Sequence, residues 1–390
     1  MDALMLPLNW QRVRLGDIAE INPPTIIPNV FYYIDLESVE KGQLLNKQLM
    51  TKNKAPSRAR RLLSKNDILY QLVRPYQRNN YFFTLNGNYV ASTGYAQIRT
   101  LQNPSFLYFA LHSNYFVNAV LDRCEGTSYP AISSNELKKC EVILPPLNEQ
   151  IAIANILSDV DHYLHALRAL ILKKEGVKKA LSFELLSQRK RLKGFNQAWQ
   201  RVRLGDVAEI KRGASPRPIE NPKWFCTNSN VGWVRISDIS KNSRFLYKTA
   251  QKLSKKGIEK SRLVKQNSLI MSMCATIGKP IITKIDTCIH DGFVVFENPK
   301  IDLNYLYYFL CYIEKEWLES GQQGSQVNLN VDLIKNKEVF CPKDLNEQIA
   351  IANILSGLDH EIISLKNKKR QFENIKKALN HDLMSAKIRV

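Results

Sequence analysis

The chain has 390 residues, of which 44% are hydrophobic and 9% aromatic, so it can form buried cores and is not a disordered chain. Lys and Arg number 56 against 36 Asp and Glu, and this net charge of +20 is typical of chains that bind nucleic acid, with a basic solubilising surface as the alternative. No apolar run reaches the ~18 residues that a membrane-spanning helix needs and the first residues lack a secretory signal, so we expect a cytoplasmic protein.

Two stretches of the sequence occur twice. Trp10–Ile21 and Trp199–Ile210 read WQRVRLGDIAEI and WQRVRLGDVAEI, and Leu147–His162 and Leu345–His360 read LNEQIAIANILSDVDH and LNEQIAIANILSGLDH. The sequence between these motifs diverges almost completely. We therefore predict a duplicated scaffold with two variable globular domains and two repeated spacers. The predicted domains are 1–147 and 199–345, and the predicted spacers are 148–198 and 346–390.

The first segment, 1–147, is predicted to be a mixed α/β domain. Short β-rich runs between turn residues indicate strands at 67–73 and 89–98. Apolar residues on one face indicate a helix at 106–121.

The second segment, 148–198, is predicted to be one long helix that begins at Asn148 as N-cap. Its apolar residues recur three and four residues apart, which is typical of a coiled-coil seam. Lys174 and Lys178 interrupt this seam, as polar residues that fix register do. The predicted seam residues are Leu157, Val160, Leu164, Leu167, Ile171, Leu181, Leu185 and Leu192.

The third segment, 199–345, is again predicted to be mixed α/β. The same signals predict strands at 232–239, 268–273, 280–285 and 292–296 and a helix at 303–318.

The fourth segment, 346–390, is predicted to be a second long helix, with Asn346 as N-cap and Lys369 and Lys376 interrupting its seam. We expect the two long helices to pair with each other in an antiparallel orientation. The alternative is that each helix pairs with another subunit. The predicted seam residues of this helix are Leu355, Leu358, Ile362, Leu365, Phe372, Leu379, Leu383 and Ala386.

Motifs of common catalytic sites are missing from the sequence. It contains no G-x-x-x-x-G-K-[ST], no G-x-S-x-G and no H-E-x-x-H. The Asn22–Thr25 stretch has the N-P-P of adenine methyltransferases, but threonine replaces their stacking aromatic residue. We therefore predict no catalytic residue and no metal site, and interpret His290-Asp291 as a structural or base-reading pair. A stand-alone nuclease or methyltransferase is the alternative.

Basic residues cluster beside side chains that can hydrogen-bond to bases. Lys and Arg contact phosphates, and Arg, Asn and Gln form paired hydrogen bonds with base edges. The candidate DNA contacts in the first domain are Lys52, Lys54, Arg58, Arg60, Arg74, Tyr76, Arg78, Asn79, Thr127, Ser128 and Tyr129. Those in the second domain are Arg212, Arg217, Lys223, Lys255, Lys256, Arg262, Gln322, Gln323, Ser325, Gln326 and Asn328. For each single residue, a solvated surface position is the alternative.

Over nearly its whole length, this layout resembles the specificity (S) subunit of type I restriction–modification systems. The resemblance rests on the repeated W-x-x-V-x-L-G-D-[IV]-A-E-I and L-N-E-Q-I-A-I-A-N-I-L motifs and on the variable segments between them. The 210–216 stretch is similar to the family's usual run into a recognition domain. Asn22-Pro23-Pro24 replaces this run in the first copy, so DNA contacts of that loop are not transferred there.

The resemblance implies two target recognition domains that each read half of a split DNA site, and an antiparallel coiled coil that sets their spacing. It also implies that the helices bind two methylation (M) subunits, which hold S-adenosylmethionine, and that restriction (R) subunits supply ATP- and Mg-dependent steps. The chain itself is then expected to hold no cofactor and to catalyse nothing. A non-enzymatic coiled-coil scaffold that binds RNA or DNA is the alternative.

Overall fold

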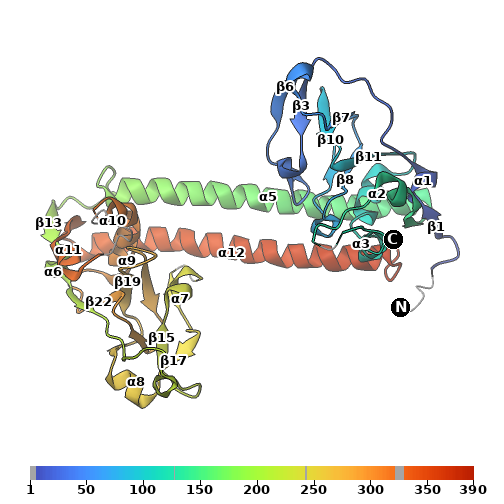
Figure 1. The fold of residues 1–390 in the computed structure, drawn as a ribbon. Coiled ribbons are helices and arrows are strands. Elements are labelled where there is room, and N and C mark those ends of the chain that lie inside the picture. Colours follow the sequence, from blue (N-terminus) through green and yellow to red (C-terminus); the bar gives the residue numbers. More distant parts are fainter. Residues whose placement is uncertain (1–5, 127, 242–243, 321–328) are drawn as a thin grey trace. The chain divides into compact units, whose positions relative to one another are not determined.

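The computed structural model describes residues 6–126, 128–241, 244–320 and 329–390. The chain forms two compact units: unit 1 comprises Met1–Ala169 and Lys366–Val390, and unit 2 comprises Leu170–Leu365. Each unit contains an α/β globule and parts of two long helices, α5 (Leu147–Leu186) and α12 (Leu345–Met384) (Figure 1). The domain boundaries expected from the repeats stay a prediction. No described helix has the length and apolar character needed to cross a membrane.

The globule of unit 1 is built on two four-stranded sheets, with strand orders β2-β11-β8-β9 and β6-β3-β10-β7, and the pair β1-β12. Only the β3–β10 pairing within these sheets is parallel. The strands are β1 (Gln11–Arg14), β2 (Ala19–Ile21), β3 (Val30–Ile34), β4 (Val39–Glu40), β5 (Gln43–Leu44), β6 (Gln48–Thr51), β7 (Ala59–Leu62), β8 (Ile68–Gln71), β9 (Tyr81–Phe82), β10 (Tyr89–Ser92), β11 (Tyr95–Thr100) and β12 (Glu141–Leu144). The helices are α1 (Leu15–Ile18), α2 (Pro104–Ala110), α3 (Asn114–Leu121) and α4 (Ser134–Lys139).

Unit 2 has a similar topology, with strand orders β14-β22-β19-β20-β16 and β17-β15-β21-β18 and the pair β13-β23. Its first sheet has a fifth strand, β16, which pairs in parallel with β20. Its strands are β13 (Trp199–Arg203), β14 (Glu209–Arg212), β15 (Gly232–Val234), β16 (Phe245–Leu246), β17 (Gln251–Lys252), β18 (Arg262–Val264), β19 (Leu269–Ser272), β20 (Pro280–Thr283), β21 (Thr287–Ile289), β22 (Phe293–Glu297) and β23 (Glu338–Pro342). Its helices are α6 (Leu204–Val207), α7 (Ile236–Ser240), α8 (Lys255–Glu259), α9 (Leu303–Tyr312), α10 (Glu314–Ser320) and α11 (Val331–Asn336). The mixed α/β class and the internal duplication are confirmed.

The end of each long helix completes the core of one globule. Leu383 and Met384 of α12 are buried in the main core of unit 1. Leu185 and Leu186 of α5 take the same part in unit 2. Burying a leucine side chain contributes about 1.5–3 kcal/mol, so these contacts fix the helix ends to the globules.

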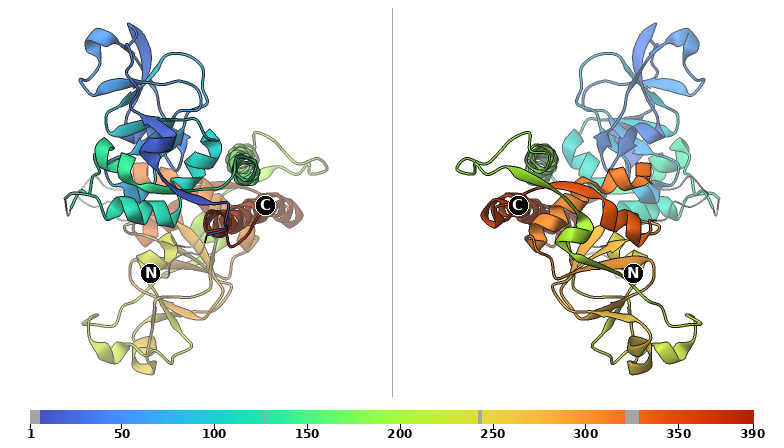
Figure 2. Two further views of the ribbon diagram at one scale, coloured as in Figure 1. Left: turned by 90° about the vertical axis from the view of Figure 1, so that its right-hand side faces the viewer. Right: turned by 90° about the vertical axis from the view of Figure 1, so that its left-hand side faces the viewer.

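Within each unit, α5 and α12 pack side by side and run antiparallel, as predicted (Figures 1 and 2). In unit 1, Lys376 Nζ lies 2.6 Å from an oxygen of Asp161. In unit 2, Lys178 Nζ lies 2.5 Å from an oxygen of Asp359. Asp359 lies 198 residues after Asp161, and Lys376 lies 198 residues after Lys178. The two ion pairs are therefore copies of each other. Two of the lysines that interrupt the seam therefore join the helices.

The predicted seam residues inside the two helices are all at least half-buried. Leu157, Leu164, Leu167, Ile171, Leu185, Leu355, Ile362 and Leu383 are buried, and Val160, Leu181, Leu358, Leu365, Phe372 and Leu379 are half-buried. Leu192 and Ala386 were placed wrongly in the helices, because these end at Leu186 and Met384.

The predicted N-caps of the long helices were also wrong. Both helices begin one residue before Asn148 and Asn346, at Leu147 and Leu345. The carbonyl of Pro146 accepts the hydrogen bond from Gln150 N, at 3.0 Å.

Four of the other predicted elements divide into two. The predicted 89–98 strand turns at Thr93-Gly94 and forms β10 and β11, and the 232–239 strand is followed by α7. The 106–121 helix is interrupted before α3, where Ser113 Oγ accepts a hydrogen bond from Phe116 N and caps a new helix. The 303–318 helix divides into α9 and α10.

Candidate nucleic-acid interface

A buried carboxylate joins the two repeated motifs of unit 1. Trp10 Nε1 donates a hydrogen bond to Glu149 Oε2 at 3.0 Å, and Arg389 Nη2 donates to Oε1 at 3.0 Å. Burial alone raises the pKa of Glu149, but the hydrogen bonds from Trp10, Arg389 and Asn9 bring it below its ordinary value. Three distant parts of the chain thus meet at one charge, at the start of α5.

The same contact is built again in unit 2. Trp199 Nε1 donates to Glu347 Oε1 at 3.2 Å, and Arg191 donates to both carboxylate oxygens, at 3.1 and 2.7 Å. Arg389 lies 198 residues after Arg191, so the arginine that follows each helix binds the carboxylate of the other repeat. The repeated motifs therefore hold each globule on its helices.

A glutamine next to each buried carboxylate fixes a helix of the globule. Gln150 Oε1 accepts a hydrogen bond from the backbone nitrogen of Asn103, the N-cap of α2, at 3.1 Å. Its amide nitrogen donates to the Pro145 carbonyl at 2.8 Å. Gln348 makes the equivalent contacts in unit 2.

The first group of predicted DNA contacts in unit 1 lies on one exposed segment. Lys52 and Lys54 belong to a 3₁₀ turn, and Arg58 and Arg60 lie just before and within β7. All four side chains are exposed, and none makes an ion pair with another described residue. The structure therefore exposes all four cations on one segment of the chain.

A second group surrounds Arg74, whose guanidinium carbon lies 4.3 Å from the centre of the Tyr129 ring. Tyr129 is 64% exposed and Tyr76 is 49% exposed. Ser128 is exposed as well, and Thr127 lies outside the described residues. Exposed aromatic rings can stack on bases, and the arginine can contact phosphates.

Two other members of this group hold the loop itself. Arg78 Nη1 donates to the His112 carbonyl at 2.9 Å, and Nη2 donates to Asn114 Oδ1 at 2.8 Å. Asn79 Oδ1 accepts from the backbone nitrogen of Lys41 at 3.1 Å. The structure therefore gives Arg78 and Asn79 a role in loop conformation.

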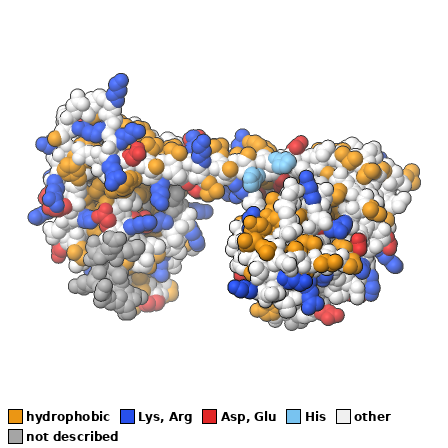
Figure 3. Space-filling model, turned by 90° about the horizontal axis from the view of Figure 1, so that it is seen from above, with side chains coloured by type: hydrophobic (Ala, Val, Ile, Leu, Met, Phe, Trp, Pro, Cys, Tyr) orange, Lys and Arg blue, Asp and Glu red, His pale blue; other side chains and the backbone are white. Residues whose placement is uncertain are grey.

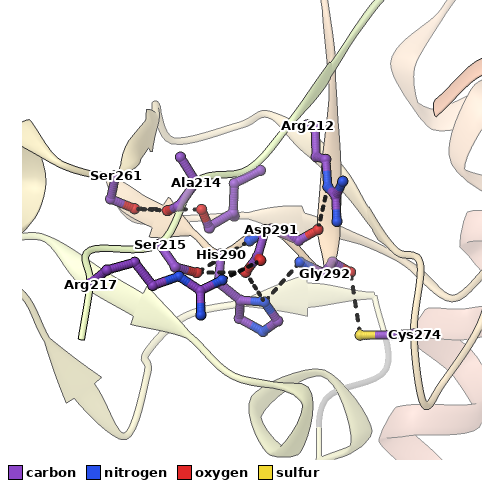
Figure 4. A network of polar contacts seen from close by, with 10 residues as sticks. Arg212, Ala214, Ser215, Arg217, Ser261, Cys274, His290, Asp291 and Gly292 are labelled. Carbon is purple, nitrogen blue, oxygen red and sulfur yellow. Dashed lines mark hydrogen bonds and ion pairs between the residues drawn. The ribbon is translucent and has the colours of Figure 1, made fainter. Parts of the chain in front are cut away.

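In unit 2, Asp291 organises the loop that follows β14 (Figure 4). Ser215 Oγ donates to Asp291 Oδ1 at 2.6 Å, and Arg217 Nη2 donates to Oδ2 at 2.9 Å. Arg212 Nε donates to the Asp291 carbonyl at 2.8 Å. The hydrogen bond from Ser215 and the charge of Arg217 lower the pKa of Asp291. The predicted DNA contacts Arg212 and Arg217 thus lie together and are exposed.

Arg262 and His290 pack on the same loop. Arg262 Nε donates to the Arg212 carbonyl. Burial lowers the pKa of His290, and its Nδ1 accepts a hydrogen bond from Gly292 N at 2.9 Å. Nowhere in the described residues do three or more His, Cys, Asp or Glu side chains gather as a metal site requires.

The remaining candidates of unit 2 fall into two groups. Lys223 Nζ lies 4.3 Å from the Trp224 ring centre, and the Lys223 carbonyl accepts a hydrogen bond from Ser254, the N-cap of α8. Lys255 and Lys256 are exposed in the first turn of α8. Gln322, Gln323, Ser325, Gln326 and Asn328 lie outside the described residues.

Lys and Arg side chains are spread over the face drawn in Figure 3, among apolar and uncharged ones. One arginine that sequence reasoning missed is buried: Arg244 is 6% exposed. Its guanidinium donates to Tyr308 Oη at 3.0 Å, Ser356 Oγ at 2.6 Å and Asn304 Oδ1 at 2.5 Å. It connects the segment before β16 with α9 and α12, and a lone arginine carries no sequence signal for such a role.

The sequence matches the protein family described as "Type I restriction modification DNA specificity domain" twice, over residues 7–174 and 196–374. It is 25% identical, over 426 aligned residues, to the specificity subunit of the type I restriction enzyme MjaVIII from Methanocaldococcus jannaschii. That alignment covers 100% of this chain and 95% of the relative. A match to the EcoprrI specificity subunit from Escherichia coli is 25% identical over 177 residues and covers 43% of each protein.

Two solved structures share the fold. The type I restriction–modification S subunit from M. genitalium has a TM-score of 0.61 at 17% identity, covering 97% of this chain and 98% of the other. The HsdS subunit from Thermoanaerobacter tengcongensis has a TM-score of 0.51 at 23% identity, covering 98% of each chain. These comparisons give no support to the alternative of a coiled-coil scaffold that binds RNA.

Proposed function

Because this chain belongs to the family of type I restriction–modification DNA specificity proteins, we propose that its two units read the two halves of a split, asymmetric DNA site. Family membership makes it a non-catalytic specificity subunit with two target recognition domains. The proposal goes further, in assigning one half-site to each unit and naming the loops that contact it.

The observation that carries this proposal is that the two units share a topology and differ in their loops. The sheet β6-β3-β10-β7 of unit 1 has the same strand order as the sheet β17-β15-β21-β18 of unit 2. The loop after β14 is held by Asp291, whereas Asn22-Pro23-Pro24 follows the equivalent strand β2. Two related scaffolds with different loops suit two different half-sites, because sequence is read by side chains that reach base edges.

The family implies assembly with methylation and restriction subunits and with DNA. We assign two methylation subunits to this chain, one on the start of each long helix. Leu147 is 56% exposed and Ile151 44% exposed, and their repeats Leu345 and Ile349 are 51% and 39% exposed. Two copies of one apolar pair suit two copies of one partner.

The chemistry is then assigned to those partners. We propose that S-adenosylmethionine is held by the methylation subunits, that ATP and Mg are used by the restriction subunits, and that the complex acts in the cytoplasm. The chain contributes the recognition of the DNA site.

A competition experiment tests this function. The chain, co-expressed with its methylation subunits, is titrated onto a labelled duplex that carries its split site. The competitors are the same duplex, duplexes with one half-site scrambled, and a structured RNA of equal length. We expect each scrambled half to weaken competition at least tenfold, since one mismatched base pair costs ~1–3 kcal/mol. Equal competition by the RNA contradicts the proposal.

A further inference from the structure

The loop that follows β2 borders a cavity of about 470 Å³ in unit 1. This volume lies within the range of roughly 300–1,000 Å³ typical of small-ligand sites. Its lining consists of residues 22–25, Ile27 and Phe31, together with several residues between 52 and 61. The lining includes the cations Lys52, Arg60 and Arg61 and no carboxylate.

Arg61 has a structural counterpart in unit 2. It lies on β7 opposite Ala91 of β10, in an antiparallel pair. Arg262 lies on β18 opposite Ile289 of β21, also in an antiparallel pair. The two sheets have the same strand order, and β10 and β21 each pair in parallel with an equivalent strand, so the two arginines occupy the same position.

The two arginines differ in what their Nε atoms bind. In unit 2, Arg262 Nε donates to the carbonyl of Arg212, in the loop that follows β14. In unit 1, Arg61 Nε is buried and has no hydrogen-bond partner among the described residues. Burial, and to a smaller extent the charge of Arg60, lower the pKa of the Arg61 guanidinium. The loop that follows β2 therefore does not hold Arg61 in the way that the loop after β14 holds Arg262.

We propose that this cavity binds a phosphate group of the DNA strand held by unit 1, with Arg61, Lys52 and Arg60 as its cationic partners. The inference rests on the proposed function and names a contact within it. Three cations without a carboxylate favour an anion, and arginine suits the oxygens of a phosphate. Pro23, Pro24 and Phe31 line the same cavity and leave an apolar surface for the attached sugar.

Single methylphosphonate substitutions in the DNA test the contact directly, because each removes the charge of one phosphate. A set of duplexes, each with one methylphosphonate in the unit 1 half-site, is titrated with the complex of this chain and its methylation subunits. The wild-type complex is expected to lose about tenfold in affinity at the phosphate that enters the cavity. In the Arg61→Met complex that loss disappears, and the slope of log K against log salt falls by about 1.

Two further variants keep the test independent of folding. Lys52→Met changes an exposed side chain of the cavity and is expected to reduce the methylphosphonate loss at the same position. Lys65→Met removes an exposed cation of unit 1 outside the cavity lining and is expected to leave that loss unchanged. A loss of the same size in wild type, Arg61→Met and Lys52→Met overturns the inference.

A second arm of the experiment distinguishes a DNA phosphate from a free nucleotide or inorganic phosphate. Thymidine monophosphate and inorganic phosphate are titrated onto the full chain without DNA, and saturable binding that Arg61→Met abolishes assigns the site to free nucleotides as well. If the wild-type complex does not distinguish its split site from scrambled DNA, the proposed function fails. If it does, but no phosphate depends on Arg61, only the cavity assignment fails.

Discussion

At the scale of residues, the buried carboxylates Glu149 and Glu347 explain why the repeated motifs have to recur together. Each accepts hydrogen bonds from a tryptophan of one motif and from an arginine that follows the other long helix. A tryptophan N–H needs an acceptor when its ring is buried, and a buried carboxylate needs donors. Removing one partner therefore leaves the other unsatisfied.

Glu347→Gln is expected to lower the free energy of unfolding of unit 2 by about 2–3 kcal/mol, because the negative charge and one of the two oxygens that accept from Arg191 are lost. Urea denaturation measures this difference. The matched control is Glu338→Gln: Glu338 is exposed and pairs with Arg201 at the surface, so its loss is expected to cost less than about 1 kcal/mol. Equal effects of the two substitutions contradict this role of Glu347.

Glu149 makes the stability of unit 1 depend on pH. Its pKa in the folded chain lies below the ordinary value of about 4.5, so the carboxylate contributes stability above that pH. That contribution is lost as the pH falls through the folded-state pKa. Thermal unfolding between pH 7 and pH 3 is therefore expected to show a smaller fall in Tm for Glu149→Gln than for the wild-type chain. An identical fall in Tm for the Glu149→Gln and wild-type chains contradicts this role of Glu149.

Exposed cations were easier to predict than their roles. Charge clustering identified Lys52, Lys54, Arg58 and Arg60, which the structure places on one exposed segment. The same reasoning could not separate Arg78 from them, because its contacts with His112 and Asn114 depend on the tertiary fold. Whether these residues contact DNA stays a prediction.

At the scale of elements, the long helices combine an apolar seam with repeated ion pairs. Lys174 Nζ lies 2.7 Å from Glu361 Oε1, one helical turn away from the Lys178–Asp359 pair of unit 2. Asp359 Oδ2 also accepts a hydrogen bond from Tyr308 of α9 at 2.7 Å. These contacts fix the register of the helices and connect them to the globule.

A double-mutant cycle on Lys178→Met and Asp359→Asn is expected to give a coupling energy of about 1 kcal/mol, since both side chains are mostly buried. Chemical denaturation of the two single variants and the double variant gives this value. Lys190 and Glu184 form the control pair, because they are more exposed and 3.9 Å apart, and their coupling is expected to be near zero. Additive effects at Lys178 and Asp359 contradict the assigned register.

Periodicity predicted the long elements and missed the short breaks. The seam spacing of α5 and α12 continues over many turns, and this redundancy makes a long helix predictable. Thr93-Gly94 and Ser113 interrupt apolar runs with a turn and a cap, which single residues decide. The helix starts were misplaced because Asn148 and Asn346 are good N-caps, yet the helices begin one residue earlier.

At the scale of the whole molecule, duplication separates what is shared from what varies. Both units keep the buried Trp–Glu–Arg contact, and their recognition loops differ. Replacing residues 22–140, which lie between the repeated motifs, with the equivalent segment of a related chain is therefore expected to change one half of the methylated motif and leave the other intact. Methylation mapping of the host genome measures this, and a change in both halves contradicts one reader per half-site.

The central claim, that this chain directs modification to a split DNA site, is tested most directly by deletion. The methylome of a host that carries this gene and its methylation-subunit gene is compared with that of a strain lacking this gene alone. The account predicts that one DNA-methylation motif, with two short unequal halves around a fixed gap, disappears in the deletion strain. A motif that persists unchanged without the chain contradicts the account.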